Sequence, residues 1–336
     1  MIRRDIHLNY DFFDYVRLED SVPAADPGCV DVALLDMNHS WPNLGHDSIV
    51  HALLELAEGM RDQLVPAGLK VRVLSFDVRR RLLLPVADDD QFAMYVGTGG
   101  PGHLDPRQND GIHEFSQGIN ESAKWEAPLF RLFDAIVADG NRSLFAVCHS
   151  FGLLCRWSGV ARPELREEKS SGLPMNVLSD DALAHPWFSR FADALADHRS
   201  FRVVDNRLFD LVWEGGRDAT PIAFEAEGSQ GLTMVELARD PSGTMSRMLG
   251  VNHHPEIIDR EHILQVLDEK RQRGEVSETW YQERAITMRE LFEGENERQS
   301  RQTSSFTFLE PMRHQLGRSV TQRIDDLSLT ARRNNR

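Results

Sequence analysis

The residues best suited to chemistry lie in the segment FAVCHSFGLL, Phe145 to Leu154, where Cys148 and Ser150 stand close together. An apolar run of strand length precedes them and apolar residues at helical spacing follow, so both fall at a strand-to-helix turn. The start of a helix lowers the pKa of a thiol through the positive end of the helix dipole. The segment therefore predicts a nucleophile, which is either Cys148 or Ser150.

The serine alternative matches only half of a known pattern. In the nucleophile elbow G-x-S-x-G, small residues flank the serine. Gly152 fits the second glycine, but Cys148 stands where the first should be. A serine triad also needs an acid and then a histidine downstream, and nothing in the sequence singles out the acid. We expect Ser150 instead to lie on the first turn of the helix, where its hydroxyl can help to cap it.

A histidine and a glutamate two positions apart, His254 and Glu256, favour the cysteine. They lie in GVNHHPEI, Gly250 to Ile257. An imidazole next to a thiol completes an ion pair and later protonates the leaving amine, and a carboxylate on the far ring nitrogen orients it. The intervening proline stiffens this link. The neighbouring His253 is the alternative base, although loop packing is its simpler role.

A glycine-rich segment, GTGGPG from Gly97 to Gly102, supplies a third part of the site. A tetrahedral intermediate needs backbone N–H donors, and a residue without a Cβ allows the chain to approach the substrate closely. Gly99 or Gly100 is the expected donor on this segment. The N–H of His149, next to the nucleophile, is the expected second donor.

These three segments together resemble the class I glutamine amidotransferase-like family, in the same order along the chain. AVCHSFGLL resembles the family's elbow G-[IV]-C-x-G-x-Q-[LM]-[LM], GTGGPG its oxyanion loop, and GVNHHPEI its G-x-x-[FY]-H-P-E ending. The resemblance covers roughly residues 30–256. It implies a flavodoxin-like fold, an enzyme with the triad Cys148, His254 and Glu256, and hydrolysis of an amide through a thioester.

Three elbow positions depart from the family. Ala146 replaces a glycine, Ser150 replaces the glycine two positions after the cysteine, and Gly152 replaces the glutamine four positions after it. That glutamine helps to hold the substrate in the family. The resemblance thus implies glutamine or a related γ-glutamyl amide as substrate, with glutamine itself in question.

The resemblance leaves several functions open. Glutamine amidotransferases pass ammonia to a synthetase, and this sequence contains no G-x-x-x-x-G-K-[ST] nucleotide loop. The implied alternatives are an acceptor enzyme acting in trans, or a free-standing hydrolase that releases ammonia to water. A cysteine-dependent acyltransferase of similar fold and a catalytically inactive binding or regulatory subunit are further alternatives.

Net charge, apolar runs and the number of cysteines limit the possible partners and the cellular compartment. A formal net charge of -15 over 336 residues argues against a nucleic-acid partner, because phosphate neutralisation needs clustered Lys and Arg. The N-terminus has no continuous apolar segment typical of a secretory signal, and no apolar run is long enough for a membrane span. Three cysteines do not make a disulfide framework. We therefore expect a cytoplasmic protein without a membrane partner.

We expect neither a metal nor another cofactor. His103, His149, His253 and His254 lie near the predicted site but lack any recognised ligand spacing, and adjacent histidines rarely bind one ion. Cys155 is most simply a small buried residue.

The elements that position these residues alternate between strands and helices. Strands are predicted at 30–37, 69–78, 91–97 and 143–147, with helices at 47–65, 126–140 and 151–160. This alternation predicts an α/β fold with a doubly wound, mostly parallel sheet flanked by helices, in which ligands bind at the carboxyl ends of the strands.

The second half of the sequence is less regular, and its polar segments suggest where the domain ends. Strands are expected within 201–212, 221–227, 232–237 and 247–258, and a polar helical stretch at about 260–293. The predicted organisation is an N-terminal extension (1–28), one amidotransferase-like α/β domain (29–293), and a polar C-terminal tail or docking arm (294–336).

Overall fold

The computed structural model of the chain describes residues 8–40, 44–216, 218–226, 231–258, 260–272, 274, 276–291 and 293–334. Among these residues, no helix is both long enough and apolar enough to cross a membrane.

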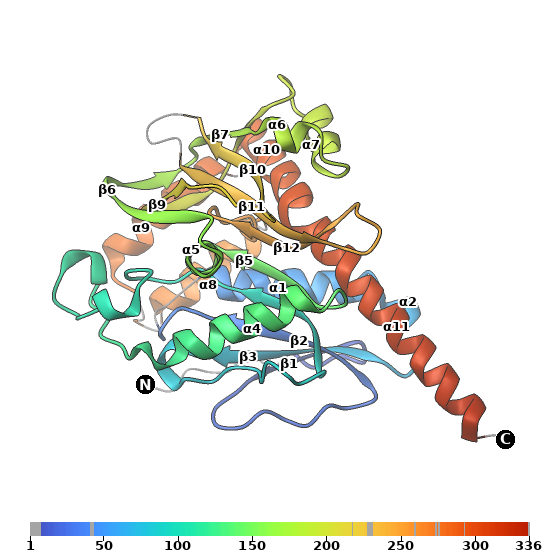
Figure 1. Ribbon diagram of the computed structural model, residues 1–336. Helices are drawn as coiled ribbons and strands as arrows, with labels where there is room; N and C mark the ends of the chain where they lie inside the picture. The colour runs from blue at the N-terminus through green and yellow to red at the C-terminus, as the bar shows by residue number, and fades with distance from the viewer. Residues whose placement is uncertain are drawn as a thin grey trace.

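Within the described residues, a mixed ten-stranded sheet forms the centre of the fold (Figure 1). The first six strands in spatial order pair in parallel, and the remaining pairs are antiparallel. The strands in that order are β1 (Phe13–Arg17), β3 (Lys70–Asp77), β2 (Cys29–Asp36), β4 (Phe92–Gly97), β5 (Ser143–Val147), β12 (Ser246–Val251), β11 (Leu232–Arg239), β10 (Thr220–Glu225), β7 (Met175–Leu178) and β8 (Ser200–Arg202). The predicted doubly wound, mostly parallel α/β sheet is confirmed.

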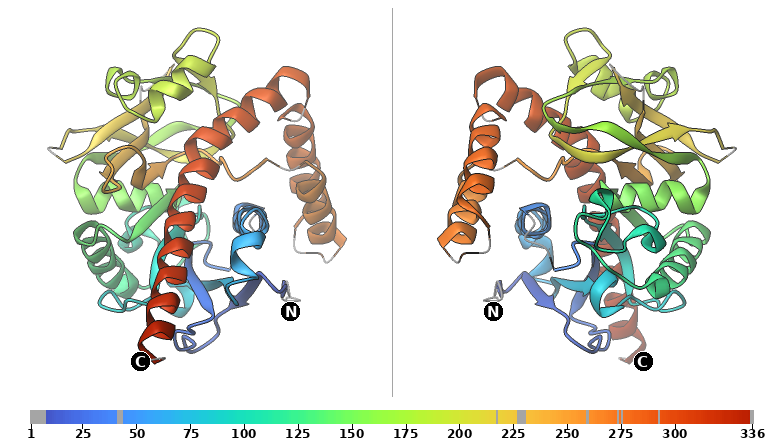
Figure 2. Two further views of the ribbon diagram at one scale, coloured as in Figure 1. Left: turned by 90° about the vertical axis from the view of Figure 1, so that its right-hand side faces the viewer. Right: turned by 90° about the vertical axis from the view of Figure 1, so that its left-hand side faces the viewer.

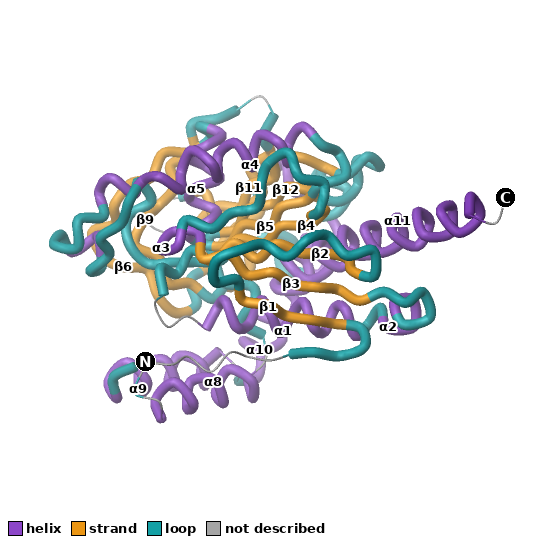
Figure 3. Tube along the Cα trace, turned by 90° about the horizontal axis from the view of Figure 1, so that it is seen from below, coloured by secondary structure: helices purple, strands orange, loops and turns teal. Residues whose placement is uncertain are grey.

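Helices cover both faces of this sheet (Figures 2 and 3). Apolar residues of α4 (Glu126–Ala138) and α5 (His149–Ser158) form one core layer, and those of α1 (Leu44–Glu58) and α11 (Glu310–Asn334) lie in the other. The two layers explain why β2 and β5 are continuous apolar runs, since strands buried on both faces do not alternate.

The remaining helices are short or lie toward the C-terminal half. They are α2 (Arg61–Leu64), α3 (Val78–Arg81), α6 (Asp180–Leu183), α7 (Phe188–Ala194), α8 (Arg260–Gln272), α9 (Glu278–Leu291) and α10 (Gly294–Ser304), together with the 3-10 turns Pro106–Gln108, Glu114–Ser116 and Ala123–Trp125. The polar helical stretch expected at about 260–293 is thus the two helices α8 and α9.

A separate two-stranded antiparallel sheet, β6 (Ala161–Gly172) with β9 (Asp205–Trp213), was not predicted as a unit. Figure 1 shows this pair beside α9, to one side of the main sheet. It matters for function because β9 forms one wall of the candidate site.

The two ends of the chain are part of the fold rather than appended to it. β1 lies within the predicted extension 1–28, yet it pairs in parallel with β3 at the edge of the main sheet. The predicted tail 294–336 is helical where described, and Phe308, Met312, Leu316 and Val320 are fully buried in the core. A π-helical turn, Ser305–Leu309, joins α10 to α11. Burial of this apolar stripe corrects the prediction of a tail or docking arm.

Candidate active site

Cys148 stands at a sharp turn between β5 and α5. It is the residue before the first turn of the helix, with φ of 50° and ψ of −104°. A residue with a Cβ reaches such positive φ values only at a cost of about 1–3 kcal/mol, and such strain clusters at functional sites. Two hydrogen bonds hold the turn, from the Cys148 N–H to the Val251 carbonyl (2.8 Å) and from the Gly152 N–H to the Cys148 carbonyl (3.0 Å). The thiol therefore lies at the positive end of the α5 dipole.

Ser150 lies on the first turn of α5 but points away from the site. It is 1% exposed, and its hydroxyl donates to the Thr98 carbonyl at 2.6 Å, so it does not cap the helix as expected. Gly97 makes room for it, since a Cβ there would lie 2.5 Å from the Ser150 Oγ. This glycine explains how the elbow accepts serine where the resembling family has glycine.

The absence of a side chain at Gly152 likewise leaves room for a neighbouring residue, Leu104. A Cβ at Gly152 would lie 2.5 Å from Leu104 Cδ1 and 2.6 Å from Cδ2. Leu104 is 5% exposed and packs against Phe151 and Cys155 of α5. Leu104 thus fills the space beside Gly152 that any side chain at this position would need.

His254 lies beside Cys148, just beyond the end of β12. Its Nδ1 is 2.8 Å from Glu256 Oε1, and it also hydrogen bonds to the Cys148 side chain, which leaves Nε2 for the sulfur. Burial by itself lowers the pKa of His254, but the negative charges of Glu256 and Cys148 outweigh it and hold that pKa well above 6.5. Glu256 is 1% exposed. The three side chains thus form a continuous chain from sulfur to carboxylate.

His253, the alternative base, is buried in a different direction. Its Nε2 lies 3.3 Å from Thr307 Oγ1, at the π-helical turn, and it does not line the pocket around Cys148. Burial lowers the pKa of His253 to about 3, with further lowering by the charges of His254 and Arg207. A histidine that stays neutral and faces another element suits packing rather than proton transfer.

The glycine-rich loop, Gly97–Gly102, passes directly over the thiol and the imidazole. A Cβ at Gly99 would lie 3.0 Å from His254 Cε1 and 3.7 Å from the Cys148 sulfur, and one at Gly100 would lie 2.3 Å from the Met37 carbonyl oxygen. Gly100 therefore requires glycine, and a side chain at Gly99 would crowd the imidazole.

Arg79 fixes the loop from behind. Its guanidinium donates to the Met37 carbonyl (2.9 Å) and the Pro101 carbonyl (2.6 Å), and it forms a fully buried ion pair with Glu121 at 2.5 Å. A buried, bidentate pair of this kind holds the loop in one place. Sequence analysis did not identify Arg79, because it lies in a run of three arginines without a distinguishing pattern.

His149 joins the elbow to the same loop. It is 3% exposed, and its ring hydrogen bonds to the backbone of Gly100. Burial, with the nearby charges of Arg79 and Arg156, lowers the pKa of His149 well below 6.5. His149 and Gly100 both line the pocket that contains Cys148.

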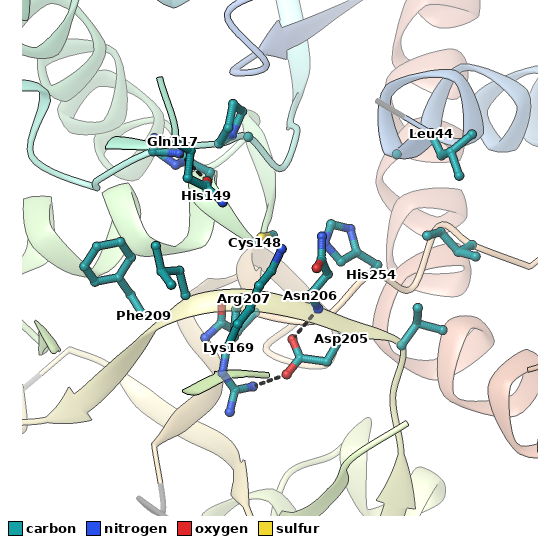
Figure 4. A pocket seen from close by; sticks show the side chains of 18 of the residues that line it. Leu44, Gln117, Cys148, His149, Lys169, Asp205, Asn206, Arg207, Phe209 and His254 are labelled. Carbon is teal, nitrogen blue, oxygen red and sulfur yellow. Dashed lines mark hydrogen bonds and ion pairs between the residues drawn. The ribbon is translucent and has the colours of Figure 1, made fainter. Parts of the chain in front are cut away.

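This pocket has a volume of about 210 Å³ and brings the thiol and the imidazole together (Figure 4). Its walls are the glycine-rich loop, the start of β9 (residues 205–209) and one face of α9. Trp280, Arg284 and Met288 form that face, because residues four apart lie on the same side of a helix. The volume corresponds to roughly seven waters, which is room for a small metabolite.

An ion-pair network under β9 makes this wall rigid. Arg207 pairs with Asp205 (2.9 Å), with Asp210 (3.2 Å) and with Glu225, and Arg166 of β6 pairs with Asp210 and Glu225. Each charged group in the network therefore has a partner of opposite sign.

Two further cationic residues, which sequence analysis did not identify, line the pocket. Lys169 comes from β6 and Arg284 from α9, and both line the pocket with Cys148. Each lies among other charged residues in a polar segment, so only the tertiary fold singles them out. Among the described residues, no three His, Cys, Asp or Glu side chains are grouped to hold a metal ion.

Comparison with known proteins supports the fold. No family model matches the sequence, and no curated protein matches it. A glutamine amidotransferase structure from Thermotoga maritima aligns over 87% of this chain and 98% of its own, with a TM-score of 0.50 and 12% identity. A glutamine amido transferase structure from Methylobacillus flagellatus aligns over 70% of this chain and 73% of its own, with a TM-score of 0.45 and 13% identity. The chain thus has the α/β fold of the class I glutamine amidotransferase-like proteins that the motifs predict.

Proposed function

We propose that this protein is a cysteine-dependent amide-hydrolysing enzyme with Cys148 as nucleophile, His254 as acid and base, and Glu256 as the residue that orients the imidazole. The observation that carries the proposal is the continuous contact from the strained Cys148 through His254 to Glu256, at the start of a helix and inside a pocket. The amidotransferase-like fold is consistent with this chemistry but does not determine it.

The arrangement supports a two-step reaction. The Cys148 thiolate attacks the carbonyl carbon of a primary amide, and the backbone N–H groups of His149 and of Gly99 or Gly100 stabilise the oxyanion. The C–N bond then breaks, and the nitrogen takes a proton from His254 Nε2 and leaves as ammonia, which gives a thioester. Water attacks the thioester and gives one proton to His254, and the intermediate collapses to the thiolate and a carboxylic acid, which loses its remaining proton to solvent.

The raised pKa of His254 suits the first step. A raised pKa favours the protonated ring, which is the form that donates a proton to the leaving nitrogen. The ammonia is released to water, or to an acceptor enzyme acting in trans where one docks, since the sequence contains no nucleotide loop of its own.

The test combines thiol reactivity with ammonia release. The rate of iodoacetamide alkylation at Cys148, located by peptide mass mapping, is measured against pH in the wild type and in His254→Gln and Glu256→Gln. Ammonia is measured from a panel of primary amides, with hydroxylamine added to trap a thioester as the hydroxamate. Cys148→Ser is the control for background hydrolysis.

We expect iodoacetamide to alkylate Cys148 rapidly well below pH 8. In His254→Gln the alkylation rate near pH 6.5 should fall at least about tenfold. We also expect ammonia and hydroxamate to form only with Cys148 intact. A thiol that reacts no faster than glutathione, together with no ammonia from any amide, would reject the proposal in favour of a binding subunit. Hydroxamate formed from an ester or thioester but from no amide would point to acyl transfer instead.

A further inference from the structure

Some charged side chains that line the pocket have ion-pair partners of opposite charge, and others do not. Asp205 is the single Asp or Glu among the described residues that line it. That carboxylate accepts from the Ser170 hydroxyl at 2.5 Å and from the Asn206 N–H at 3.0 Å, and it pairs with Arg207 at 2.9 Å. Arg207 is in turn shared among three carboxylates. Neither residue is therefore available to bind a charged ligand.

Lys169 and Arg284 are not balanced in this way. In the described part of the chain, no carboxylate lies within ion-pair distance of either side chain, and Arg284 donates instead to the amide oxygen of Asn206 at 3.2 Å. The structure thus places two cations without carboxylate partners at the nucleophile in a protein that carries an excess of acids. Arg284 is partly buried, where an unpaired charge is costly, whereas Lys169 is exposed and adds positive charge to the same pocket.

The electrostatics of both groups agree with this view. Burial, followed by the positive charge of Arg284, lowers the pKa of Lys169, whereas the charges of Cys148 and Asp205 raise it only in part. Burial also lowers the pKa of Arg284, and the charge of Glu283 raises it only in part. An anion bound beside the two cations would favour the charged form of each.

We propose that Lys169 and Arg284 form a subsite for the carboxylate of the substrate, and that the pocket selects an ω-amide of a dicarboxylic acid over an amino acid amide such as glutamine. This inference rests on the proposed function. An α-ammonium group would be repelled by both cations, and the pocket offers it no carboxylate that is not already paired. Glutaramate, which is glutamine with hydrogen in place of its α-amino group, is the simplest compound of the class.

The remaining lining suits the carbon chain of such a substrate. Trp280 and Met288 of α9 and Ile257 bring apolar surface to the same pocket, beside Arg284. A volume of about 210 Å³ suits a small amide. A short chain with an amide at one end and a carboxylate at the other fits both the charge and the size.

The first experiment compares an anionic and a neutral reagent on one thiol. Cys148 is alkylated by iodoacetate and by iodoacetamide, and the ratio of the two rates is divided by the same ratio for glutathione. The ratio cancels any change in thiol pKa, because both reagents attack the same thiolate. The variants are Lys169→Ala, Lys169→Arg and Arg284→Ala, with Arg289→Ala as the matched control on the exposed side of α9.

We expect the normalised ratio to exceed one in the wild type and to fall about fivefold in Lys169→Ala and in Arg284→Ala. Lys169→Arg and Arg289→Ala should keep the wild-type ratio. Equal ratios in all variants, with Cys148 still highly reactive, would overturn the anion subsite and leave the proposed function intact. Low reactivity with both reagents would reject the proposed function, and the ratio would still decide the subsite.

The second experiment tests the exclusion of the α-ammonium group. Protection of Cys148 from iodoacetamide is measured with glutaramate, L-glutamine and the neutral pentanamide. Glutaramate should protect at concentrations at least about tenfold lower than either other amide, and Lys169→Ala should bring it close to pentanamide. Protection by glutamine as strong as that by glutaramate would overturn the proposed selectivity.

Discussion

Replacement of Gly152 by glutamine tests why the elbow departs from the family that it resembles. In the structure a Cβ at this position would lie 2.5, 2.6 and 3.1 Å from three side-chain atoms of Leu104. Non-bonded carbons prefer about 3.5–4.0 Å, so the overlap is about 1 Å before the rest of the glutamine side chain is added. Leu104 cannot easily move aside, because it is 5% exposed and packs against Phe151.

The expected cost of Gly152→Gln is about 1–3 kcal/mol in the free energy of unfolding, which is typical of an overpacked core. Leu104→Ala alone should cost about 2–5 kcal/mol, because it leaves a cavity. In the double variant the new side chain enters that space. The double variant should therefore be more stable than the sum of the two single effects predicts, by about 1–3 kcal/mol.

Urea-induced unfolding of the four proteins measures this coupling. Gly140→Gln is the matched control, since Gly140 is exposed and a Cβ there would contact nothing within 4 Å. It should change the stability by less than about 0.5 kcal/mol. Additive effects in the double variant, or a Gly152→Gln no less stable than Gly140→Gln, would refute the argument that Leu104 occupies the glutamine's place.

Two further predictions concern the imidazole and the C-terminal helix. Because the folded-state pKa of His254 is raised above 6.5, its contribution to stability is full below that pH and is lost as the pH rises through the folded-state pKa. The difference in unfolding free energy between wild type and His254→Gln should therefore shrink as the pH rises above 6.5, and a constant difference in urea titrations would contradict this. Leu316→Ala, at a fully buried position of α11, should cost about 2–5 kcal/mol, whereas Leu329→Ala, 53% exposed on the same helix, should stay within about 0.5 kcal/mol in the same titrations.

The parts of the fold that local pattern determines could be predicted from the sequence. β2 and β5 are apolar runs of strand length, and α4 has apolar residues at helical spacing, so each was found within a few residues of its bounds. The elbow at Cys148 follows from the junction of strand and helix. Its strained φ could not be predicted, because it depends on hydrogen bonds to β12 and within α5.

The parts that depend on distant partners could not be predicted in the same way. The strand β1, FDYVR, carries two charged residues, and only its pairing with β3 makes it a strand. The buried residues Phe308, Met312, Leu316 and Val320 recur every four positions, but α10 before them is strongly polar. The polar sequence of α10 therefore suggested a tail, and the apolar residues that follow it were not recognised as part of the core.

In the candidate site too, the residues proposed for catalysis lie in motifs that the sequence shows, whereas the residues proposed for substrate selection depend on the tertiary fold. The groups proposed for bond breaking sit at the ends of β5 and β12, where a motif marks them and where adjacent parallel strands bring them together. The groups proposed to select the substrate, Lys169 and Arg284, come from β6 and α9, outside the motifs. A glutamine at position 152 would compete with Leu104 for space, whereas Lys169 and Arg284 come from other elements that line the pocket. Substrate recognition can thus move to those elements while the thiol, imidazole and carboxylate keep their positions, which is the reason to test glutaramate before glutamine.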